Sequence, residues 1–159
     1  GREFESCPAP KAKTCTMIRD LLEKLIYNRY KIFESRQEMN NTTNDNEMIE
    51  KTVQFYIDGA KSGKGDDMKP AFHKDATIFG YIGDDLFAGP IQKLFDWNDE
   101  NGPATELETK IASIDVVGTV ATVRLESDNW TGHKFTDFFT LLKVEGTWKI
   151  MNKVFHLHA

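Results

Sequence analysis

The C-terminal part of the chain, from Pro103 onward, carries the pattern that most restricts the fold. β-branched and aromatic residues dominate it, and the glycine dipeptides Val117-Gly118, Thr131-Gly132 and Glu145-Gly146 divide it. Glycine-containing turns between segments of this kind are typical of consecutive hairpins. We therefore expect four antiparallel strands, with the sequences LETKIASIDVVG, TVATVRLESDNW, KFTDFFTLLKV and TWKIMNKVFHLH.

Helical patterns precede these strands. Apolar residues recur at helical spacing over residues 17–39 and 47–62, and the polar stretch NNTTNDNE between them predicts a linker. A short helix around residues 67–72, a strand in DATIFGYIG and a helix in GPIQKLFDWNDENG follow. Helices first and an antiparallel meander last predict the α+β class, with the sheet curled over the helices.

Length and charge limit the functional classes. A chain of 159 residues suffices for one compact domain with its own core. The net charge of -5 argues against a nucleic-acid partner, which would call for a basic patch. No apolar run is long enough to span a membrane. We expect a cytoplasmic location, with a secreted or periplasmic one as the alternative if a leader preceded Gly1.

The N-terminal region is expected to lie outside the main domain. We assign residues 1–45 to an arm and an accessory helix, and residues 46–159 to the domain. The arm, residues 1–16, begins with GREF, which is typical of residues left by cloning, and holds both cysteines, Cys7 and Cys15. The sequence leaves open whether these cysteines are two free thiols or form one disulfide bridge. The helix is interpreted as accessory, with a partner-binding or dimerisation helix as the alternative.

From about residue 46 the chain resembles the nuclear-transport-factor-2-like superfamily, most closely its SnoaL-like and putative lumazine-binding branch. The segments that carry the resemblance are VQFYIDGAKSG, FHKDATIFGY, AGPIQKLFDW, IDVVGTVATVRLE, NWTG and FTDFFTLLKVEGTWKIMNKVF. The resemblance implies a cone in which a bent antiparallel sheet wraps about three helices and opens on an apolar pocket. It also implies a dimer through the outer sheet face. Because the superfamily holds both enzymes and non-catalytic domains, it implies no single activity.

The ketosteroid isomerases of this superfamily suggest a pair of site residues. By resemblance, their oxyanion-hole tyrosine and aspartic acid correspond to Tyr56 and Asp137, whereas their catalytic base corresponds to Gly80. Without that base the isomerase reaction lacks its proton carrier. Tyr56 and Asp137 would then bind a carbonyl or phenolate oxygen without turning the ligand over.

The alternation of side chains along a strand places Asp137 on the same face as Phe135, Phe139 and Leu141. If Glu145-Gly146 is a two-residue turn, Asp137 lies opposite Val154, and Asn152 opposite Phe139. A carboxylate on an apolar face either lines a pocket or is satisfied by neighbouring donors. Burial would favour its neutral form, which donates a hydrogen bond.

Further residues are candidates for the site. His73 is a tentative acid–base residue, with helix capping as the alternative, and His156 and His158 alternate on one strand without a third metal ligand. We expect no metal and no cofactor. The predicted ligand-binding residues, several of which are equally compatible with a structural role, are Phe79, Tyr81, Trp97, Trp130, Phe139, Asn152 and His156.

Three functions follow from these residues. The first is a homodimeric domain whose apolar pocket binds a small aromatic or apolar ligand. The second is a cofactor-independent isomerase, dehydratase or polyketide cyclase-like enzyme that uses Asp137 or His73 with Tyr56. The third is a non-catalytic association module. The absence of a nucleophile elbow, a phosphate-binding glycine loop and an HExxH motif disfavours covalent hydrolases, nucleotide-triphosphate enzymes and zinc proteases.

Overall fold

The computed structural model describes residues 12–159, which divide into two compact units between Asn41 and Thr42. The second unit, Thr42–Ala159, contains the sheet and every candidate site residue. Cys7 lies outside the described residues, so the state of the two thiols stays a prediction. Within residues 12–159, no helix has an apolar stretch of the length needed to cross a bilayer.

Helix α1, Ala12–Ser62, is continuous through the polar stretch that predicted a linker. The predicted break is therefore wrong, as is the extension of the N-terminal arm to residue 16. Asn, Thr and Asp are poor helix formers, but the segment contains no proline and its single glycine, Gly59, lies near its end. Weak propensity without a breaker residue did not interrupt the helix.

The remaining elements follow the predicted order. Helix α2 (Gly65–Met68) and a 3₁₀ turn (Lys69–Ala71) lead into β1, and α3 (Gln92–Asn101) precedes the meander. All four predicted C-terminal strands are present, and β2 was not predicted. The strands are β1 (Phe72–Ile82), β2 (Asp85–Pro90), β3 (Glu108–Val117), β4 (Val120–Trp130), β5 (His133–Val144) and β6 (Thr147–Leu157).

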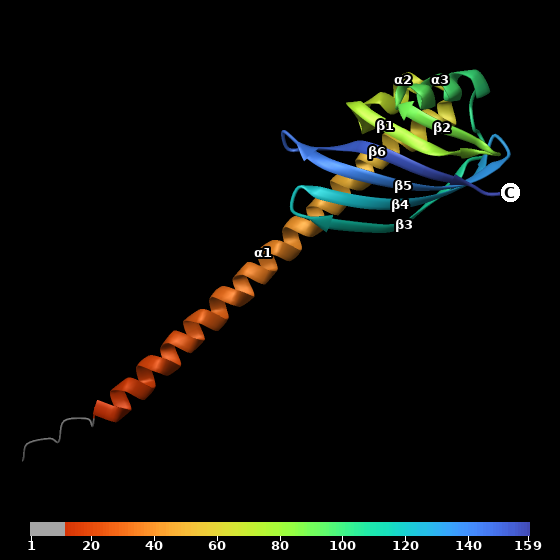
Figure 1. Ribbon diagram of the computed structural model, residues 1–159. Coiled ribbons are helices and arrows are strands. Elements are labelled where there is room, and N and C mark those ends of the chain that lie inside the picture. The colour runs from red at the N-terminus through yellow and green to blue at the C-terminus, as the bar shows by residue number, and fades with distance from the viewer. Residues whose placement is uncertain (1–11) are drawn as a thin grey trace, which may run out of the picture. The chain divides into compact units, whose positions relative to one another are not determined.

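The six strands form one curved sheet in the order β2-β1-β6-β5-β4-β3, which does not close on itself (Figure 1). The α+β class is confirmed. The sheet is mixed rather than antiparallel as predicted, because β1 pairs with β6 in parallel while every other pairing is antiparallel. Hairpin turns force antiparallel neighbours, whereas β1 and β6 are far apart in sequence and no turn constrains their relative direction.

The core lies between the inner face of the sheet and the C-terminal half of α1. One side of this helix is buried at Ile49, Val53, Tyr56, Ile57 and Ala60. Thr52 Oγ1 donates to the Trp148 carbonyl of β6 at 3.2 Å, which ties the helix to the sheet. Helix α3 adds Phe95, whose ring packs edge-on against that of Phe72 with 5.6 Å between the ring centroids.

The buried Asp45 connects the packed part of α1 to the sheet. Asp45 Oδ1 accepts hydrogen bonds from Lys143 Nζ at 2.6 Å and from Trp148 Nε1 at 3.0 Å. The Lys143 ammonium, together with the Trp148 indole, holds the pKa of Asp45 below its usual value despite burial. Asp45 therefore belongs to the folded domain, although it lies in the stretch that predicted a linker.

We predict that Asp45→Asn lowers the free energy of unfolding at pH 7 by about 1–3 kcal/mol, because Lys143 loses its charged acceptor. The folded-state pKa of Asp45 is lowered, so its stabilisation is complete above the unfolded-state value of 3.8 and is lost as the pH falls through the folded-state value. The difference between wild type and variant should therefore narrow below pH 4 in urea unfolding curves. The exposed Asp58 on the same helix gives the control, Asp58→Asn; an equal loss in both variants would contradict the assignment.

Candidate functional site

Tyr56 and Asp137 meet in the core. Asp137 shares a buried face of β5 with Phe135, Phe139 and Leu141, as the alternation predicted. The Tyr56 hydroxyl on α1 donates a hydrogen bond to Asp137 Oδ2 at 2.7 Å, and both residues are at most 1% exposed. Two residues that are 81 positions apart in sequence thus form one polar contact inside an apolar core.

Lys153 is the third member of this cluster and was not among the predicted site residues. Its ammonium donates to Asp137 Oδ1, and the residue is only 3% exposed. The cluster Tyr56–Asp137–Lys153 is called the buried triad below. Within the triad Asp137 accepts two hydrogen bonds, which agrees with the predicted alternative of a carboxylate satisfied by neighbouring donors and not with that of a neutral donor.

A one-residue bulge in β6 explains why Lys153 points inward. The Glu145-Gly146 turn has the predicted two-residue form, since Val144 pairs with Thr147, and the register holds as far as Leu141 opposite Ile150. Thr140 then pairs with Asn152, which leaves Met151 without a partner on β5. An extra residue reverses the facing of every side chain after it, so β6 buries Trp148 and Ile150 before the bulge and Lys153 and Phe155 after it.

The predicted cross-strand neighbours beyond the bulge are therefore wrong. Asp137 lies opposite Phe155 rather than Val154, and Phe139 lies opposite Lys153 rather than Asn152. The side chain of Asn152 instead donates to Thr77 Oγ1 at 2.9 Å, and His156 is exposed, with its ring centroid 4.7 Å from that of His158. The alternation of Lys153 with Phe155 and Leu157 was visible in the sequence, but not the face on which it lies.

Burial determines the electrostatics of the triad. It lowers the pKa of the Lys153 ammonium, and the Asp137 carboxylate opposes part of this shift. The same burial, with the charge of Asp137 beside it, raises the pKa of Tyr56 well above its usual value, so Tyr56 stays a protonated donor. Lys153 Nζ also lies 5.1 Å from the ring centroid of Phe155, a distance at which the aromatic face attracts a cation.

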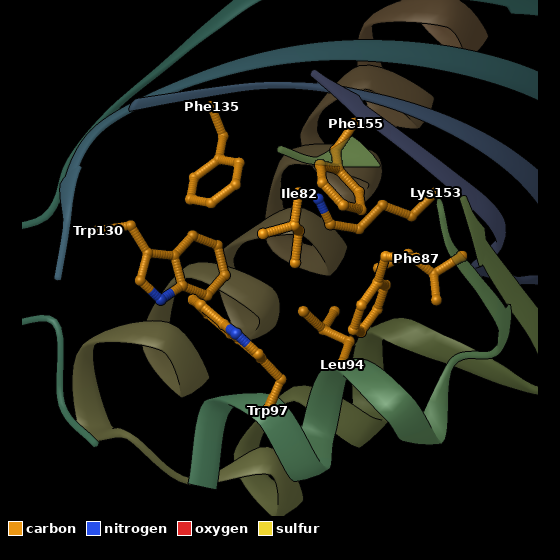
Figure 2. A pocket seen from close by; sticks show the side chains of 9 residues that line it. Ile82, Phe87, Leu94, Trp97, Trp130, Phe135, Lys153 and Phe155 are labelled. Atoms are coloured by element: carbon orange, nitrogen blue, oxygen red, sulfur yellow. The ribbon is translucent and has the colours of Figure 1, made fainter. Parts of the chain in front are cut away.

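An apolar cavity lies beside the triad, with a free volume of about 30 Å³. Figure 2 shows Lys153 entering it from β6 among aromatic and aliphatic side chains. Two predicted ligand residues, Trp97 and Trp130, line it, whereas a third, Phe139, is not a lining residue and packs on Tyr56 with 5.2 Å between the ring centroids. The lining residues are Ile78, Ile82, Phe87, Leu94, Trp97, Trp130, Phe135, Lys153 and Phe155.

Trp130, a lining residue, carries a buried polar group near the cavity. Its indole Nε1 is buried and has no hydrogen-bond partner within residues 12–159. Buried polar groups are rarely left unpaired in folded proteins. The indole N–H is therefore a free donor among the residues that line the cavity.

Three other predicted site residues do not reach the cavity. Phe79 and Tyr81 are 41% and 60% exposed, because side chains alternate along β1 and the alternate positions, Ile78 and Gly80, face inward. His73, at the start of β1, accepts a hydrogen bond on Nδ1 from the backbone N–H of Asp75 at 3.2 Å. It lines a separate surface depression with Lys69 and Gln92. The structure therefore brings Tyr56 and Asp137 together but leaves His73 apart.

The space beside Gly80, the position that the resemblance assigned to the isomerase base, is occupied by an aromatic ring. A Cβ atom at this position would lie 2.4 Å from the ring of Phe155, so any larger residue requires that ring to move. Phe155 occupies this space because the bulge turns it inward.

Within residues 12–159, no cluster of three or more His, Cys, Asp or Glu side chains is arranged to hold a metal ion.

We predict that Asp137→Asn and Lys153→Met each lower the free energy of unfolding by about 3–5 kcal/mol, because each leaves a buried charge without its partner. The double variant should lose clearly less than the sum, because both charges are gone. Urea unfolding of the four proteins measures this coupling. The exposed pair Lys134–Asp128, at 3.0 Å, provides the control, and Asp128→Asn should cost at most about 1 kcal/mol. Strictly additive losses at positions 137 and 153 would refute the coupling.

Comparison with known proteins places the domain. A protein of Methylobacillus flagellatus KT, described as nuclear-transport-factor-2-like and of unknown function, is 55% identical, with a TM-score of 0.72 over 73% of this chain and 94% of that one. A similarly described protein of Shewanella baltica OS155 is 43% identical, with a TM-score of 0.71 over 74% of this chain and 96% of that one. Aldolase FrzH of a Cladobotryum species is 28% identical over 116 residues, which are 72% of this chain and 93% of that protein.

The match to a family covers the same region as the sheet and the triad. The family described as "Putative lumazine-binding" matches residues 44–156, which include Tyr56, Asp137 and Lys153. Its extent agrees with the compact unit Thr42–Ala159, and the solved relatives share the fold. The chain thus belongs to the "Putative lumazine-binding" family of the nuclear-transport-factor-2-like superfamily.

Proposed function

We propose that the domain binds a small, mostly apolar or aromatic carbonyl compound in the cavity beside the buried triad. The observation that carries this proposal is the chemistry of the cavity wall, where eight lining residues are apolar and the ninth is Lys153. A few polar groups on an apolar wall are typical of small-molecule sites. The family description, which names lumazine binding, also supports a small-molecule ligand.

The two hydrogen-bond donors nearest the cavity favour a ligand that carries an acceptor. Both belong to lining residues: the Lys153 amine, which donates to Asp137, and the Trp130 N–H, which has no partner within the described residues. Neither group accepts a hydrogen bond in its present form. Both nitrogens are buried, so a ligand carbonyl oxygen would reach either donor only after a small side-chain movement, and a purely apolar ligand would give neither donor an acceptor.

The size of the cavity indicates which part of the ligand is enclosed. The free volume of about 30 Å³ exceeds the roughly 10–15 Å³ that a cavity needs in order to hold one water molecule, so the enclosed space suits a small group. It therefore accommodates a carbonyl group, and the rest of the ligand would lie against the partly exposed side chains Ile82, Phe87 and Trp97. A two-ring compound such as lumazine would enter fully only if these side chains moved.

We predict that acetophenone, benzaldehyde or lumazine raises the thermal midpoint of the protein. A ligand at about 100 times its dissociation constant adds about 2.7 kcal/mol, which corresponds to several degrees for a chain of this size. Trp97→Ala should weaken the shift, because it removes apolar contact at the mouth. The matched control is Val117→Ala, at a 75% exposed residue of β3 away from the cavity lining. A shift unchanged in Trp97→Ala, or none with any compound, would contradict a ligand site here.

A second candidate function is an acid–base enzyme that acts on a carbonyl compound, the alternative raised by the sequence. The similarity to a protein named aldolase FrzH favours it, as does the presence of an amine, a carboxylate and a phenol in one buried cluster. Ketosteroid isomerisation is disfavoured, because Phe155 fills the space next to Gly80 where that base would stand. Conversion of a bound carbonyl compound, lost in Asp137→Asn, would distinguish the enzyme from the binder.

We also propose that the domain forms a homodimer through the outer face of the sheet. Phe79, Val154 and Phe138 lie side by side on β1, β6 and β5 and are 41%, 44% and 53% exposed. These strands are in the middle of the sheet, so the row is not an edge. Apolar side chains grouped on an open sheet face favour coverage by a partner, and a second copy presents the same row.

We predict that the full chain sediments as a dimer at micromolar concentration and that Phe138→Arg shifts it to monomer. A charge in the centre of an interface typically costs 2 kcal/mol or more, a loss of about 30-fold in affinity. Val117→Arg, at an exposed position outside the row, should leave the dimer intact. A wild-type monomer would rule out the proposed interface, and a dimer that persists in Phe138→Arg would place it elsewhere.

A further inference from the structure

We propose that Lys153 forms a covalent imine with an aldehyde or ketone bound in the cavity. This inference rests on the proposed carbonyl site and specifies its chemistry. It is carried by the position of the amine: Lys153 Nζ belongs to a side chain that lines the cavity, in contact with Asp137 and surrounded by rings. The exposed Lys74 also has a carboxylate beside it, Asp75 at 2.7 Å, but it lacks the apolar surroundings.

The surroundings of Nζ favour a reactive amine. It lies 5.1, 5.5 and 5.7 Å from the ring centroids of Phe155, Tyr56 and Phe139, so water has little access to it. A lysine desolvated in an apolar pocket is one of the ways in which proteins activate an amine nucleophile. Burial lowers the pKa of Lys153 and so increases its neutral fraction, although Asp137 opposes this shift.

Asp137 provides the proton transfers that imine formation requires. A proton moves from Lys153 Nζ to Asp137 Oδ1, which leaves a neutral amine and a neutral carboxylic acid. The amine lone pair forms a C–N bond with the carbonyl carbon, the carbonyl π electrons pass to oxygen, and that oxygen takes the proton from Asp137. The product is a carbinolamine with a protonated nitrogen, beside a carboxylate.

Loss of water completes the step. Asp137 takes one proton from the nitrogen and delivers it to the hydroxyl group as the C–O bond breaks. Water leaves, the nitrogen lone pair forms the C=N bond, and an iminium ion remains beside the Asp137 carboxylate. No oxidant, reductant or other reactant is consumed. Tyr56 is a positioning residue here, because its hydroxyl holds the other carboxylate oxygen, Oδ2, at 2.7 Å.

The stability of the fold does not by itself require an ion pair between Lys153 and Asp137. Buried ion pairs are often matched or exceeded in stability by apolar residues of similar volume. The same face of the sheet already buries Phe135, Phe139 and Phe155, so an apolar pair would suit it. A chemical use of the amine accounts for the retained charges, and the cavity beside it provides the space for a carbonyl carbon.

The test is reductive trapping in the wild-type protein. The full chain is incubated near neutral pH with propionaldehyde or benzaldehyde and sodium cyanoborohydride, which transfers hydride to the iminium carbon. Peptide mass spectrometry then maps the modified lysines, each heavier by the mass of the aldehyde less one oxygen atom. We expect Lys153 to be modified at least ~10-fold faster than Lys74, whose side chain is 81% exposed. Tyr56→Phe should slow labelling at Lys153 and leave Lys74 unchanged.

Binding and covalent capture are separated by a parallel thermal-shift series without reductant. A midpoint shift with benzaldehyde, combined with labelling of exposed lysines only, would overturn the imine and leave the carbonyl site in place. No shift and no labelling of Lys153 would overturn both. Lys153→Arg provides a variant that keeps the positive charge but forms no imine. It should abolish capture at position 153, while the mapping in wild type stands even if that variant fails to fold.

Discussion

A one-residue bulge at Met151 determines which side chains of β6 beyond it face the core, and the candidate site depends on it. Before the bulge, β6 buries Trp148 and Ile150; after it, β6 buries Lys153 and Phe155. The neighbouring strand β1 is irregular at the same level, since its register with β6 shifts between Phe72 and Thr77. Without the bulge, Asn152 and Val154 would face Asp137, and the amine would lie outside.

The bulge has two consequences for chemistry. It gives Asp137 a buried cation, so that the carboxylate accepts hydrogen bonds from Lys153 and Tyr56 instead of standing alone on an apolar wall. It also turns the ring of Phe155 into the space next to Gly80. The site therefore combines an aromatic ring beside Gly80 with an amine beside the carboxylate of Asp137.

The fold and the function are supported to different degrees. Relatives with 55% and 43% identity share the domain and are described as of unknown function, while the relative named as an aldolase is more distant, at 28% identity. Because one fold supports many activities, the functional proposal rests on the triad and the cavity. Their chemistry, an amine and a carboxylate in contact within an apolar enclosure, is compatible with carbonyl binding and with carbonyl transformation alike.

The sequence alone determined the four C-terminal strands, the two-residue turn at Glu145-Gly146 and the shared face of Asp137 with Phe139, because side-chain alternation and turn chemistry act over a few residues. The tertiary structure decided the burial of Asp45, the parallel pairing of β1 with β6 and the inward facing of Lys153. The first depends on partners that are distant in sequence, Lys143 and Trp148. The others depend on which strands pair and where one of them gains a residue, and neither has a local signal in the chain.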